Sequence, residues 1–193
     1  MQNESENMRG IRVASFFTGA GGLDFGFHQL GFDLVYVTDI EKIFCDTLTV
    51  NRGKYLPQDV TIHNADIRDL PQASLPTNID LVIGGPPCQS FSASGRRAGG
   101  AAGTLDAKGA LFEAYCQHIA YLQPKAFVFE NVRGILGTNR GNDWADVVQA
   151  FRSIGYHLSY RVLDACDYGI PQFRERLFLV GTTEPQDFLF PAP

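Results

Sequence analysis

Short apolar runs alternate along the chain with longer stretches in which apolar residues recur every three or four positions. The short runs are typical of buried strands, and the longer stretches are typical of amphipathic helices. The pattern predicts strands over residues 11–17, 33–39, 60–66, 79–85, 125–131, 158–164 and 176–181, and helices near 22–30, 40–51, 109–122 and 142–154. This alternation indicates an α/β fold built from βαβ units around a mostly parallel sheet.

Two of these runs, DLVI in 80–83 and AFVF in 126–129, are almost continuously apolar. Such runs suit strands that are buried on both faces of a sheet. One segment breaks the rhythm: residues 92–109 are rich in glycine, alanine and serine and show no periodicity. A loop of this length in a compact domain is either a functional lid or a flexible insertion, and we expect Arg96 and Arg97 to lie on it.

The composition is that of an ordinary soluble globular protein of one domain. Of 193 residues, 45% are hydrophobic and 19% are charged, and the formal net charge is -5. No apolar run approaches the roughly 18–20 residues of a membrane span, and the polar start of the chain does not resemble a signal peptide. We therefore expect a cytoplasmic protein without a membrane partner, with residues 1–10 as a disordered tail. The acidity argues mildly against a surface devoted to nucleic acid, although a local basic patch remains compatible with it.

The four cysteines, Cys45, Cys88, Cys116 and Cys166, lie far apart and form no CxxC pair, so we expect neither a zinc site nor a disulfide framework. Cys45 and Cys116 fall on apolar helical faces and are interpreted as buried small hydrophobes. Cys88 is different, because it follows a predicted strand within GGPPCQSFS, residues 84–92. Two prolines would hold its thiol rigidly at the sheet rim, which is typical of a nucleophile.

Other polar residues end strands at the same edge of the predicted sheet. A glycine turn, Thr18-Gly19-Ala20-Gly21-Gly22, follows the first strand, and Asp39 and Asp66 end the second and third. Glycines allow a ligand to approach the backbone, and carboxylates at strand ends bind ribose hydroxyls in nucleotide folds. The combination indicates an adenosine-containing ligand. A dinucleotide is disfavoured, because Asp24 stands where the GxGxxG motif requires glycine.

Further along, Glu130-Asn131 ends another strand, and Gln172-x-Arg174-x-Arg176 leads into the last one. A thiol with an ordinary pKa is mostly protonated at neutral pH, so a nucleophilic cysteine needs acid, base or cationic neighbours of this kind. Each group alone would be explained by surface salt bridges. Together on one sheet edge they indicate a catalytic site.

These motifs resemble, in order, those of the DNA (cytosine-5)-methyltransferases. The matching segments are Phe17-Thr18-Gly19-Ala20-Gly21-Gly22, Asp39, Ala65-Asp66-Ile67, Gly84-Gly85-Pro86-Pro87-Cys88-Gln89-Ser90-Phe91-Ser92, Gly109-Ala110-Leu111-Phe112, Glu130-Asn131-Val132 and Gln172-x-Arg174-x-Arg176. Two departures are small: Asp39 replaces the usual glutamate, and Lys108 stands where arginine is common.

The resemblance implies a Rossmann-like fold with a mostly parallel seven-stranded sheet and helices on both faces. It implies methyl transfer from S-adenosyl-L-methionine to cytosine C5 in double-stranded DNA, through a covalent bond from Cys88 to C6 of a flipped base. The implied catalytic residues are Cys88, Glu130, Gln172, Arg174 and Arg176. The implied cofactor-binding residues are Phe17, Thr18, Gly19, Ala20, Gly21, Gly22, Leu23, Asp39, Ile40, Asp66, Ile67, Gly84, Pro87 and Leu111. No metal is implied.

The family pattern continues beyond residue 181, so the resemblance implies a C-terminally incomplete catalytic domain over 11–184 and the start of a linker over 185–193. The target-recognition domain would then belong to a missing part or to a second polypeptide, and we expect the chain to be inactive without it. The resemblance also implies use in a restriction-modification system, with association with the nucleoid. Two alternatives stay open: an RNA (tRNA) cytosine-5 methyltransferase, and an inactive binding or regulatory homologue.

Overall fold

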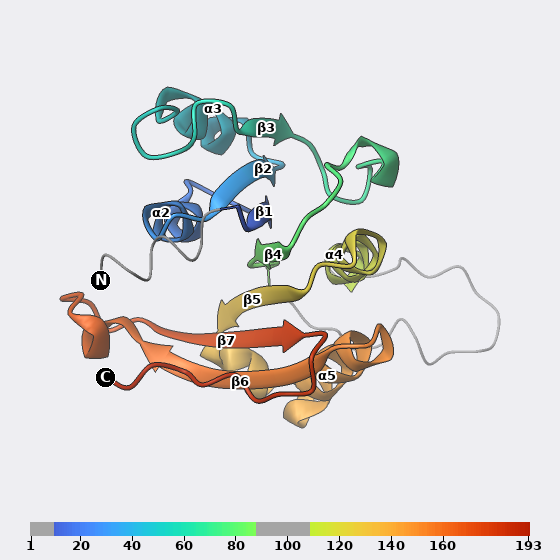
Figure 1. The fold of residues 1–193 in the computed structure, drawn as a ribbon. Helices are drawn as coiled ribbons and strands as arrows, with labels where there is room; N and C mark the ends of the chain where they lie inside the picture. The colour runs from blue at the N-terminus through green and yellow to red at the C-terminus, as the bar shows by residue number, and fades with distance from the viewer. Residues whose placement is uncertain (1–9, 88–108) are drawn as a thin grey trace. The chain divides into compact units, whose positions relative to one another are not determined.

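The computed structural model describes residues 10–87 and 109–193. Its seven strands form one mixed sheet in the order β3-β2-β1-β4-β5-β7-β6 (Figure 1). The strands are β1 (Arg12–Phe16), β2 (Asp33–Asp39), β3 (Thr61–Asn64), β4 (Leu81–Gly84), β5 (Ala126–Val132), β6 (His157–Asp164) and β7 (Glu175–Thr182). The helices are α2 (Gly22–Gln29), α3 (Lys42–Val50), α4 (Gly109–Leu122) and α5 (Asn142–Ser153). All these elements lie within a few residues of the predicted ones.

The chain divides into two compact units. One comprises Met1–Gly85 and Gln117–Phe127, and the other comprises Pro86–Cys116 and Val128–Pro193. The predicted tail lies almost wholly in residues 1–9, and the predicted loop with Arg96 and Arg97 lies in 88–108; both segments are outside the described residues.

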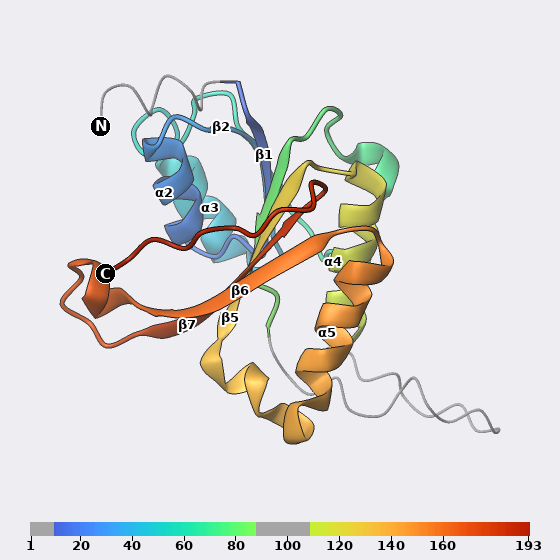
Figure 2. The same cartoon turned by 60° about the horizontal axis from the view of Figure 1, so that its bottom comes forward.

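In the first unit, β1 pairs in parallel with β2 and β4, and β2 pairs in parallel with β3. Helices α2 and α3 cover one face of these strands, and the last turns of α4 cover the other (Figure 2). The fully buried side chains between these layers are Val13, Ala14, Phe16, Val37, Leu48, Val82, Ile83 and Ile119. Because the strands are parallel, their carboxyl ends meet at one edge, which places the ends of β1, β2 and β4 together.

In the second unit, β6 and β7 form an antiparallel ribbon in which His157 faces Thr182 and Asp164 faces Glu175. The core of this unit is aromatic, since Phe112, Tyr115, Phe129 and Phe151 contact one another at ring distances of 5.4–6.4 Å. These contacts fix β5, the start of α4 and the last turn of α5 around one cluster.

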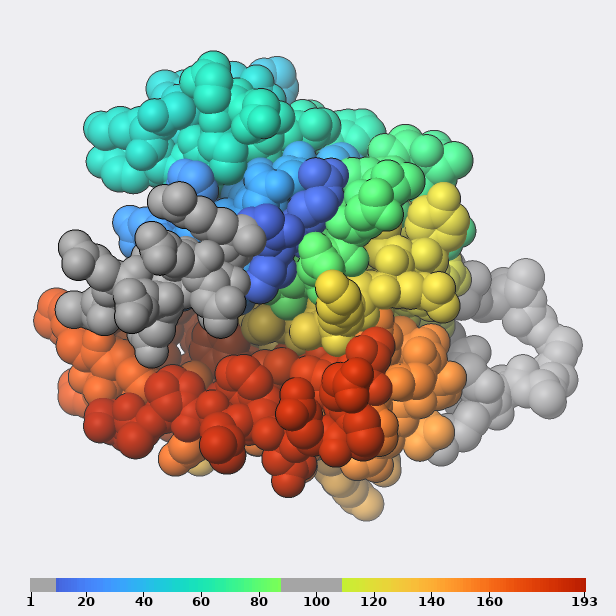
Figure 3. Space-filling view, in the orientation of Figure 1, coloured from blue at the N-terminus to red at the C-terminus, as the bar shows by residue number. Residues whose placement is uncertain are grey.

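The C-terminal residues lie on the surface of the second unit, where they appear in red in Figure 3. The Phe188 amide donates to Ser159 Oγ on β6 at 3.0 Å, and the Tyr168 hydroxyl donates to the Pro191 carbonyl at 3.0 Å. No helix of the described residues is long and apolar enough to cross a membrane.

Four short 3-10 helices were not expected from the pattern: Gln72–Ser74, Arg133–Leu136, Thr138–Gly141 and Ala165–Tyr168. Each spans only three or four residues, which is too short to leave a periodic signal in the sequence.

Candidate active site

The chain turns sharply after β1. Phe17, Gly19 and Gly21 adopt φ angles of 55°, 54° and 88°, in the left-handed region that favours glycine. The Gly21 amide donates to the Thr18 carbonyl at 3.0 Å and closes the turn. A Cβ at Gly21 would lie 2.6 Å from Leu48 Cδ2, so glycine at this position lets α2 and α3 pack closely. At Gly19 an added Cβ would meet no atom within 4 Å, which leaves the backbone of the turn open to a ligand.

Asp39, at the end of β2, binds this turn directly. One carboxylate oxygen accepts from the Gly19 amide at 2.8 Å and the other accepts from the Glu41 amide at 2.9 Å. Each oxygen keeps a lone pair, and the side chain is only half-buried. These groups fit an adenosine ribose, whose hydroxyls are donors.

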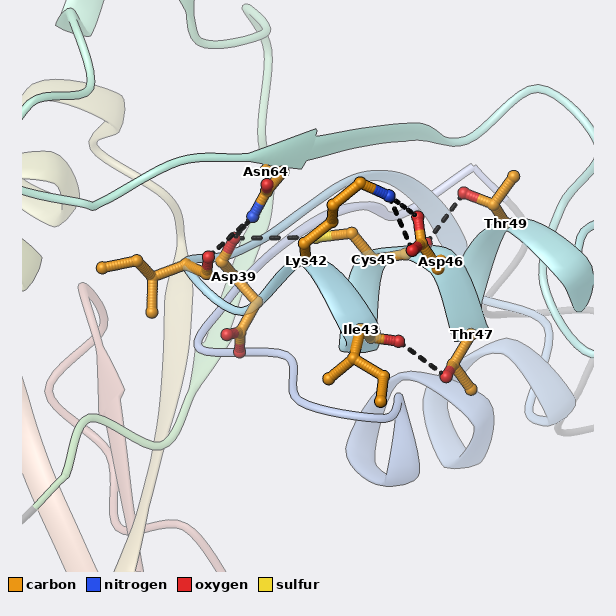
Figure 4. Close-up of polar contacts among 9 residues, drawn as sticks. Asp39, Lys42, Ile43, Cys45, Asp46, Thr47, Thr49 and Asn64 are labelled. Atoms are coloured by element: carbon orange, nitrogen blue, oxygen red, sulfur yellow. Dashed lines mark hydrogen bonds and ion pairs between the residues drawn. The ribbon is translucent and has the colours of Figure 1, made fainter.

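Asn64 fixes the backbone beside Asp39. Its amide nitrogen donates to the carbonyls of Asp39 at 3.0 Å and Ile40 at 2.8 Å. Figure 4 shows the Asp39 carboxylate pointing away from Asn64. The backbone carbonyl of Asp39 therefore binds Asn64, while its carboxylate binds the glycine turn. Cys45 Sγ lies 3.6 Å from the same Asp39 carbonyl. Asn64 was not predicted as a site residue, because a single asparagine at a strand end carries no distinctive signal.

Asp66 follows β3 and has a partner that the sequence did not suggest. Its carboxylate accepts from Arg68 Nε at 3.0 Å and from the other guanidinium nitrogen at 2.5 Å. These hydrogen bonds lower the pKa of Asp66. Ile67 is buried, whereas Ile40 is 57% exposed at the end of β2. Of the two predicted isoleucine contacts, Ile40 therefore has the accessible side chain.

Asp24 on α2 is fully buried. In the sequence it served only as an argument against the GxGxxG motif of dinucleotide-binding proteins. The Thr18 hydroxyl donates to its Oδ2 at 2.5 Å, which ties the glycine turn to the first turn of the helix. Burial raises the pKa of Asp24. Its Oδ1 has no hydrogen-bond partner among the described residues. Asp24 thus supports the turn from the core.

The remaining predicted cofactor residues lie in both units. Thr18 is buried, Leu23 is half-buried, and Ala20 and Gly22 are exposed on the turn. Gly84 is buried at the end of β4, also in the first unit. The exposed Pro87 and the half-buried Leu111 belong to the second unit.

In the second unit, Glu130 on β5 lies beside Arg176 on β7. Arg176 Nε is 3.1 Å from Glu130 Oε1, and the two side chains are 23% and 27% exposed. Burial raises the pKa of Glu130 above its ordinary value, while the positive charges of Arg176 and Arg174 act against that rise. The site therefore holds a carboxyl group that takes up a proton more readily than an exposed glutamate.

The loop that leads into β7 carries Gln172 and Arg174. Asp164 fixes the two ends of this loop, because one of its carboxylate oxygens accepts from the Arg174 amide at 2.7 Å and from the Cys166 amide at 3.4 Å. The Ala165 amide also donates to the Arg174 carbonyl at 3.2 Å. The side chains of Gln172 and Arg174 are exposed. Arg176 thus contacts Glu130, the charge of the exposed Arg174 acts on the pKa of Glu130, and Gln172 is exposed on the loop.

Cys88 lies outside the described residues, but the segment that leads into it is held. The buried Asn131 donates from its side-chain Nδ2 to the Pro86 carbonyl at 2.9 Å, and its side-chain Oδ1 accepts from the Val132 amide at 2.9 Å. Asn131 directly follows Glu130. The strand that carries the acid therefore also anchors the backbone two residues before the cysteine.

The three described cysteines are poor candidates for a nucleophile. Cys45 is buried, as predicted, whereas Cys116 is only half-buried, although burial raises its pKa to about 12. The pKa values of Cys45 and Cys166 are also raised, chiefly by desolvation. A thiol with a raised pKa carries little thiolate at neutral pH. Within residues 10–87 and 109–193, no cluster of three or more histidine, cysteine or acidic residues has metal-ligand geometry.

Comparisons with known proteins agree with the motifs. The family model of C-5 cytosine-specific DNA methylases matches residues 11–192. The Type II methyltransferase M.AquIA of Picosynechococcus is 36% identical over 197 residues, which cover 94% of this chain and 76% of that protein. M.FnuDI of Fusobacterium nucleatum is 37% identical over 186 residues, 95% of this chain and 51% of that protein.

Solved structures show the same fold. A prophage-encoded E. coli protein described as a DNA modification methyltransferase superposes with a TM-score of 0.70 at 26% identity, over 89% of this chain and 46% of its own. Dnmt2 methyltransferase of S. pombe superposes with a TM-score of 0.64 at 22% identity, over 89% and 49%. The predicted Rossmann-like fold is confirmed. The chain spans about half the length of these two structures and of M.FnuDI.

Proposed function

Because the chain belongs to the C-5 cytosine-specific DNA methylase family, we propose that it transfers a methyl group from S-adenosyl-L-methionine to C5 of cytosine in a specific DNA sequence. The Glu130–Arg176 pair carries the proposal, because it supplies an oriented acid of raised pKa. Cytosine C5 is a weak nucleophile. The reaction therefore needs a nucleophile that adds electrons to the ring and an acid that donates a proton where negative charge develops.

Cys88 is the proposed source of those electrons. Its thiolate adds to C6. The electrons of the C5–C6 double bond then move to the C4–C5 bond, and those of the C4–N3 double bond move to N3, which gains electron density. Sulfur suits this step because it is both a strong nucleophile and a good leaving group. The support in the structure is indirect: Asn131 anchors Pro86, and each described thiol has a raised pKa.

Glu130 is the proposed acid at N3. A protonated carboxyl donates to N3 as negative charge develops there, which favours the adduct. Arg176 orients the carboxyl through its Nε, and Arg174 adds positive charge. After C5 has taken the methyl group, loss of the C5 proton to a base restores the double bond and expels the Cys88 thiolate, while the proton at N3 is shared back with Glu130.

S-adenosyl-L-methionine would supply the methyl group as an electrophile on a sulfonium. The glycine turn and Asp39 are proposed to hold its ribose, because Gly19 is open to a ligand and the Asp39 carboxylate retains acceptor lone pairs. Phe17 is proposed to lie against the adenine. Asp66 is proposed to accept from the adenine amino group, which requires it to share its carboxylate with Arg68.

Sequence-specific methylation is proposed to need residues that the longer relatives have in addition, supplied by a further part or by a second polypeptide. The proposed target carbon lies inside the base stack, so the cytosine has to be flipped out of the duplex. Groups that read base edges are distinct from those that perform the chemistry. Two of the relatives are named Type II methyltransferases, and association with a restriction enzyme is proposed on that basis.

An RNA substrate is the second candidate. The fold is shared with Dnmt2 of S. pombe, but the likeness at 22% identity shows the fold alone. The relatives at 36% and 37% identity favour DNA. An inactive binding or regulatory homologue is disfavoured by the intact Glu130–Arg176 pair.

The test is transfer of labelled methyl groups to duplex DNA and to tRNA, by the chain alone and mixed with the polypeptide encoded next to it. Incorporation into DNA cytosine C5 supports the proposal. Trapping on DNA that contains 5-fluorocytosine should yield an adduct at Cys88, and the Cys88→Ser variant should yield none. An active serine variant, or an adduct at another cysteine, would contradict the assignment.

A further inference from the structure

His118 lies in the last turns of α4, and its side chain is buried with 4% exposure. Its ring lies parallel to that of Phe16, with 5.5 Å between centroids and 2° between planes. Its Nε2 is 3.0 Å from the Ile67 carbonyl oxygen. Its Nδ1 is buried and has no hydrogen-bond partner among the described residues.

The two residues that His118 contacts belong to two different segments of the proposed donor site. Phe16 ends β1 and directly precedes Phe17 and the glycine turn. Ile67 belongs to the segment 65–67 that follows β3, fifty-one residues from His118 in the chain. One ring therefore supports both segments from the core. Neither contact could be seen in the sequence, where His118 is a single polar residue next to the buried Ile119.

The hydrogen bond fixes the tautomer. A carbonyl only accepts, so Nε2 carries the proton and donates to Ile67, and the neutral ring leaves a bare lone pair at Nδ1. A phenylalanine here would fill the same space and keep the stacking on Phe16. It would also leave the Ile67 carbonyl without this donor, and an unsatisfied buried carbonyl is unfavourable. The bond to Ile67 is thus the specific contribution of histidine.

We propose that His118 is a positioning residue for the methyl donor, because it holds the Ile67 carbonyl and the Phe16 ring in one arrangement. The inference rests on the proposed function in that residues 17 and 65–67 are taken to contact S-adenosyl-L-methionine. Holding these segments before the donor arrives lowers the entropy lost on binding, so the donor binds more tightly.

The arrangement makes donor binding sensitive to pH. Protonation would place an N–H at Nδ1 where no acceptor is available, and a positive charge in a buried site. Burial accordingly lowers the pKa of His118 below the ordinary histidine value of 6.5. Near its two partners, the Asp66–Arg68 ion pair flanks Ile67 in the chain, the ring of Tyr36 contacts that of Phe16, and His63 is hydrogen-bonded to Tyr36. Burial raises the pKa of Tyr36 to about 12, so its hydroxyl stays neutral.

The sign follows from the lowered pKa. The neutral form of His118, which donates to the Ile67 carbonyl, is fully present above the ordinary pKa of histidine. Its contribution to donor binding is lost as the pH falls through the lower pKa of His118 in the folded protein. We therefore expect the affinity for donor to decrease toward acid pH. A merely structural residue would leave affinity and pH profile unchanged so long as the chain stays folded.

Two variants separate the bond from the ring. His118→Gln keeps a donor near the position of Nε2 but does not titrate, and His118→Phe keeps the ring but has no donor. Calorimetry with S-adenosyl-L-homocysteine runs from about pH 8 downward, past the ordinary histidine pKa and as low as the parent chain stays folded, because the pKa of His118 in the folded chain lies below that ordinary value. His118→Gln should bind about as tightly as the parent chain at the higher pH and show no weakening at the lower. His118→Phe should bind roughly three- to tenfold more weakly at both, the loss of one hydrogen bond.

A readout without ligand distinguishes this inference from the proposed function. The amides of Ala65, Arg68 and Asp69 are hydrogen-bonded, so their exchange with solvent can be followed. These amides should exchange faster in His118→Phe than in the parent chain, and at the parent rate in His118→Gln. His157→Gln, an exposed histidine on β6, is the matched control. Unchanged exchange and affinity in a folded His118→Phe chain overturns the inference. A parent chain that binds no S-adenosyl-L-homocysteine overturns the proposed function, and exchange still decides the role of His118.

Discussion

Arg176 contacts Glu130 while its chain neighbour Glu175 contacts Arg133, so two ion pairs of opposite polarity join β7 to β5 and to the turn after it. Arg176 Nε lies 3.1 Å from Glu130 Oε1, and an Arg133 nitrogen lies 2.7 Å from Glu175 Oε1. Glu130 and Arg176 are largely covered, whereas Arg133 and Glu175 are 63% and 45% exposed. Only the covered pair is expected to influence chemistry strongly, since exposed pairs are screened by solvent.

Glu130→Gln should slow the chemical step by about 10²–10⁴-fold, the usual contribution of a positioned acid. The amide fits the same space but cannot give a proton to N3. Binding of S-adenosyl-L-homocysteine should stay the same, because the loss is confined to the transition state. Single-turnover methyl transfer by the complete assembly measures the first effect and calorimetry the second. Glu184→Gln, in the exposed segment after β7, is the control. A variant that loses only donor affinity would refute this role for Glu130.

Arg176→Gln should raise the pKa of Glu130 further, because Arg176 is the largest influence that opposes the rise caused by burial. An acid whose folded pKa is raised contributes stability below its unfolded pKa and loses it as the pH rises through the folded value. The variant should therefore lose stability over a pH window that begins near the ordinary glutamate pKa of 4.5 and extends to higher pH than in the parent. Carboxyl NMR measures the pKa, and urea unfolding measures the stability.

Arg133→Gln supplies the contrast for that experiment. It removes an equal charge from the same end of β5, but its partner is Glu175. The pKa of Glu130 should stay close to its parent value. Equal shifts in the two variants would mean that overall charge, rather than the contact at Nε, sets the proton affinity of Glu130.

Asp39→Ala should weaken binding of S-adenosyl-L-methionine by roughly 1–3 kcal/mol, the range for lost hydrogen bonds to a buried or partly buried group. The variant also frees the Gly19 and Glu41 amides, so the glycine turn loses its link to β2. Asp46→Asn, an exposed carboxylate paired with Lys42, controls for the change in charge. Calorimetry that finds unchanged affinity, or a preference for NAD, contradicts the assignment of the turn.

Gly21→Ala should destabilise the fold by about 1–3 kcal/mol, because a left-handed residue acquires a Cβ and the added carbon overlaps a packed side chain. The closest atom, Leu48 Cδ2, would lie only 2.6 Å away. Gly22→Ala is the matched control: no atom lies within 4 Å of its Cβ and its φ is ordinary, so the change should be neutral or slightly stabilising. Chemical denaturation of both variants gives the comparison. Equal stabilities would show that the turn tolerates a side chain.

The strands and helices could be predicted because each buries a patterned face. DLVI became the core of β4, and the periodic stretch 109–122 became α4 without a change of bounds. Asp39 and Asp66 could be placed at or just after the ends of β2 and β3 because parallel strands bring those ends to one edge. These predictions use only local spacing and the geometry of a sheet.

Asp24, His118 and Asn131 could not be assigned their tasks in that way. Their partners, Thr18, Ile67 and Pro86, are chosen by packing, and two of the three lie forty-five or more residues away. A polar residue on an inward face is the only signal they leave, and its meaning depends on which buried group needs a partner. The ion pair between Arg68 and Asp66 could not be predicted for the same reason, since it is one of many conformations open to an arginine side chain.

The loop before β7 has a thermodynamic consequence. Asp164 already ties the Arg174 and Cys166 amides, so the backbone that carries Gln172 and Arg174 is ordered without substrate. Fixing one residue of a flexible loop costs about 1–2 kcal/mol of conformational entropy, and here that loss occurs during folding rather than on association. If the proposed DNA substrate contacts this loop, its binding should accordingly show a small entropic penalty, and replacing Asp164 with alanine should make the penalty larger while leaving Arg174 in place.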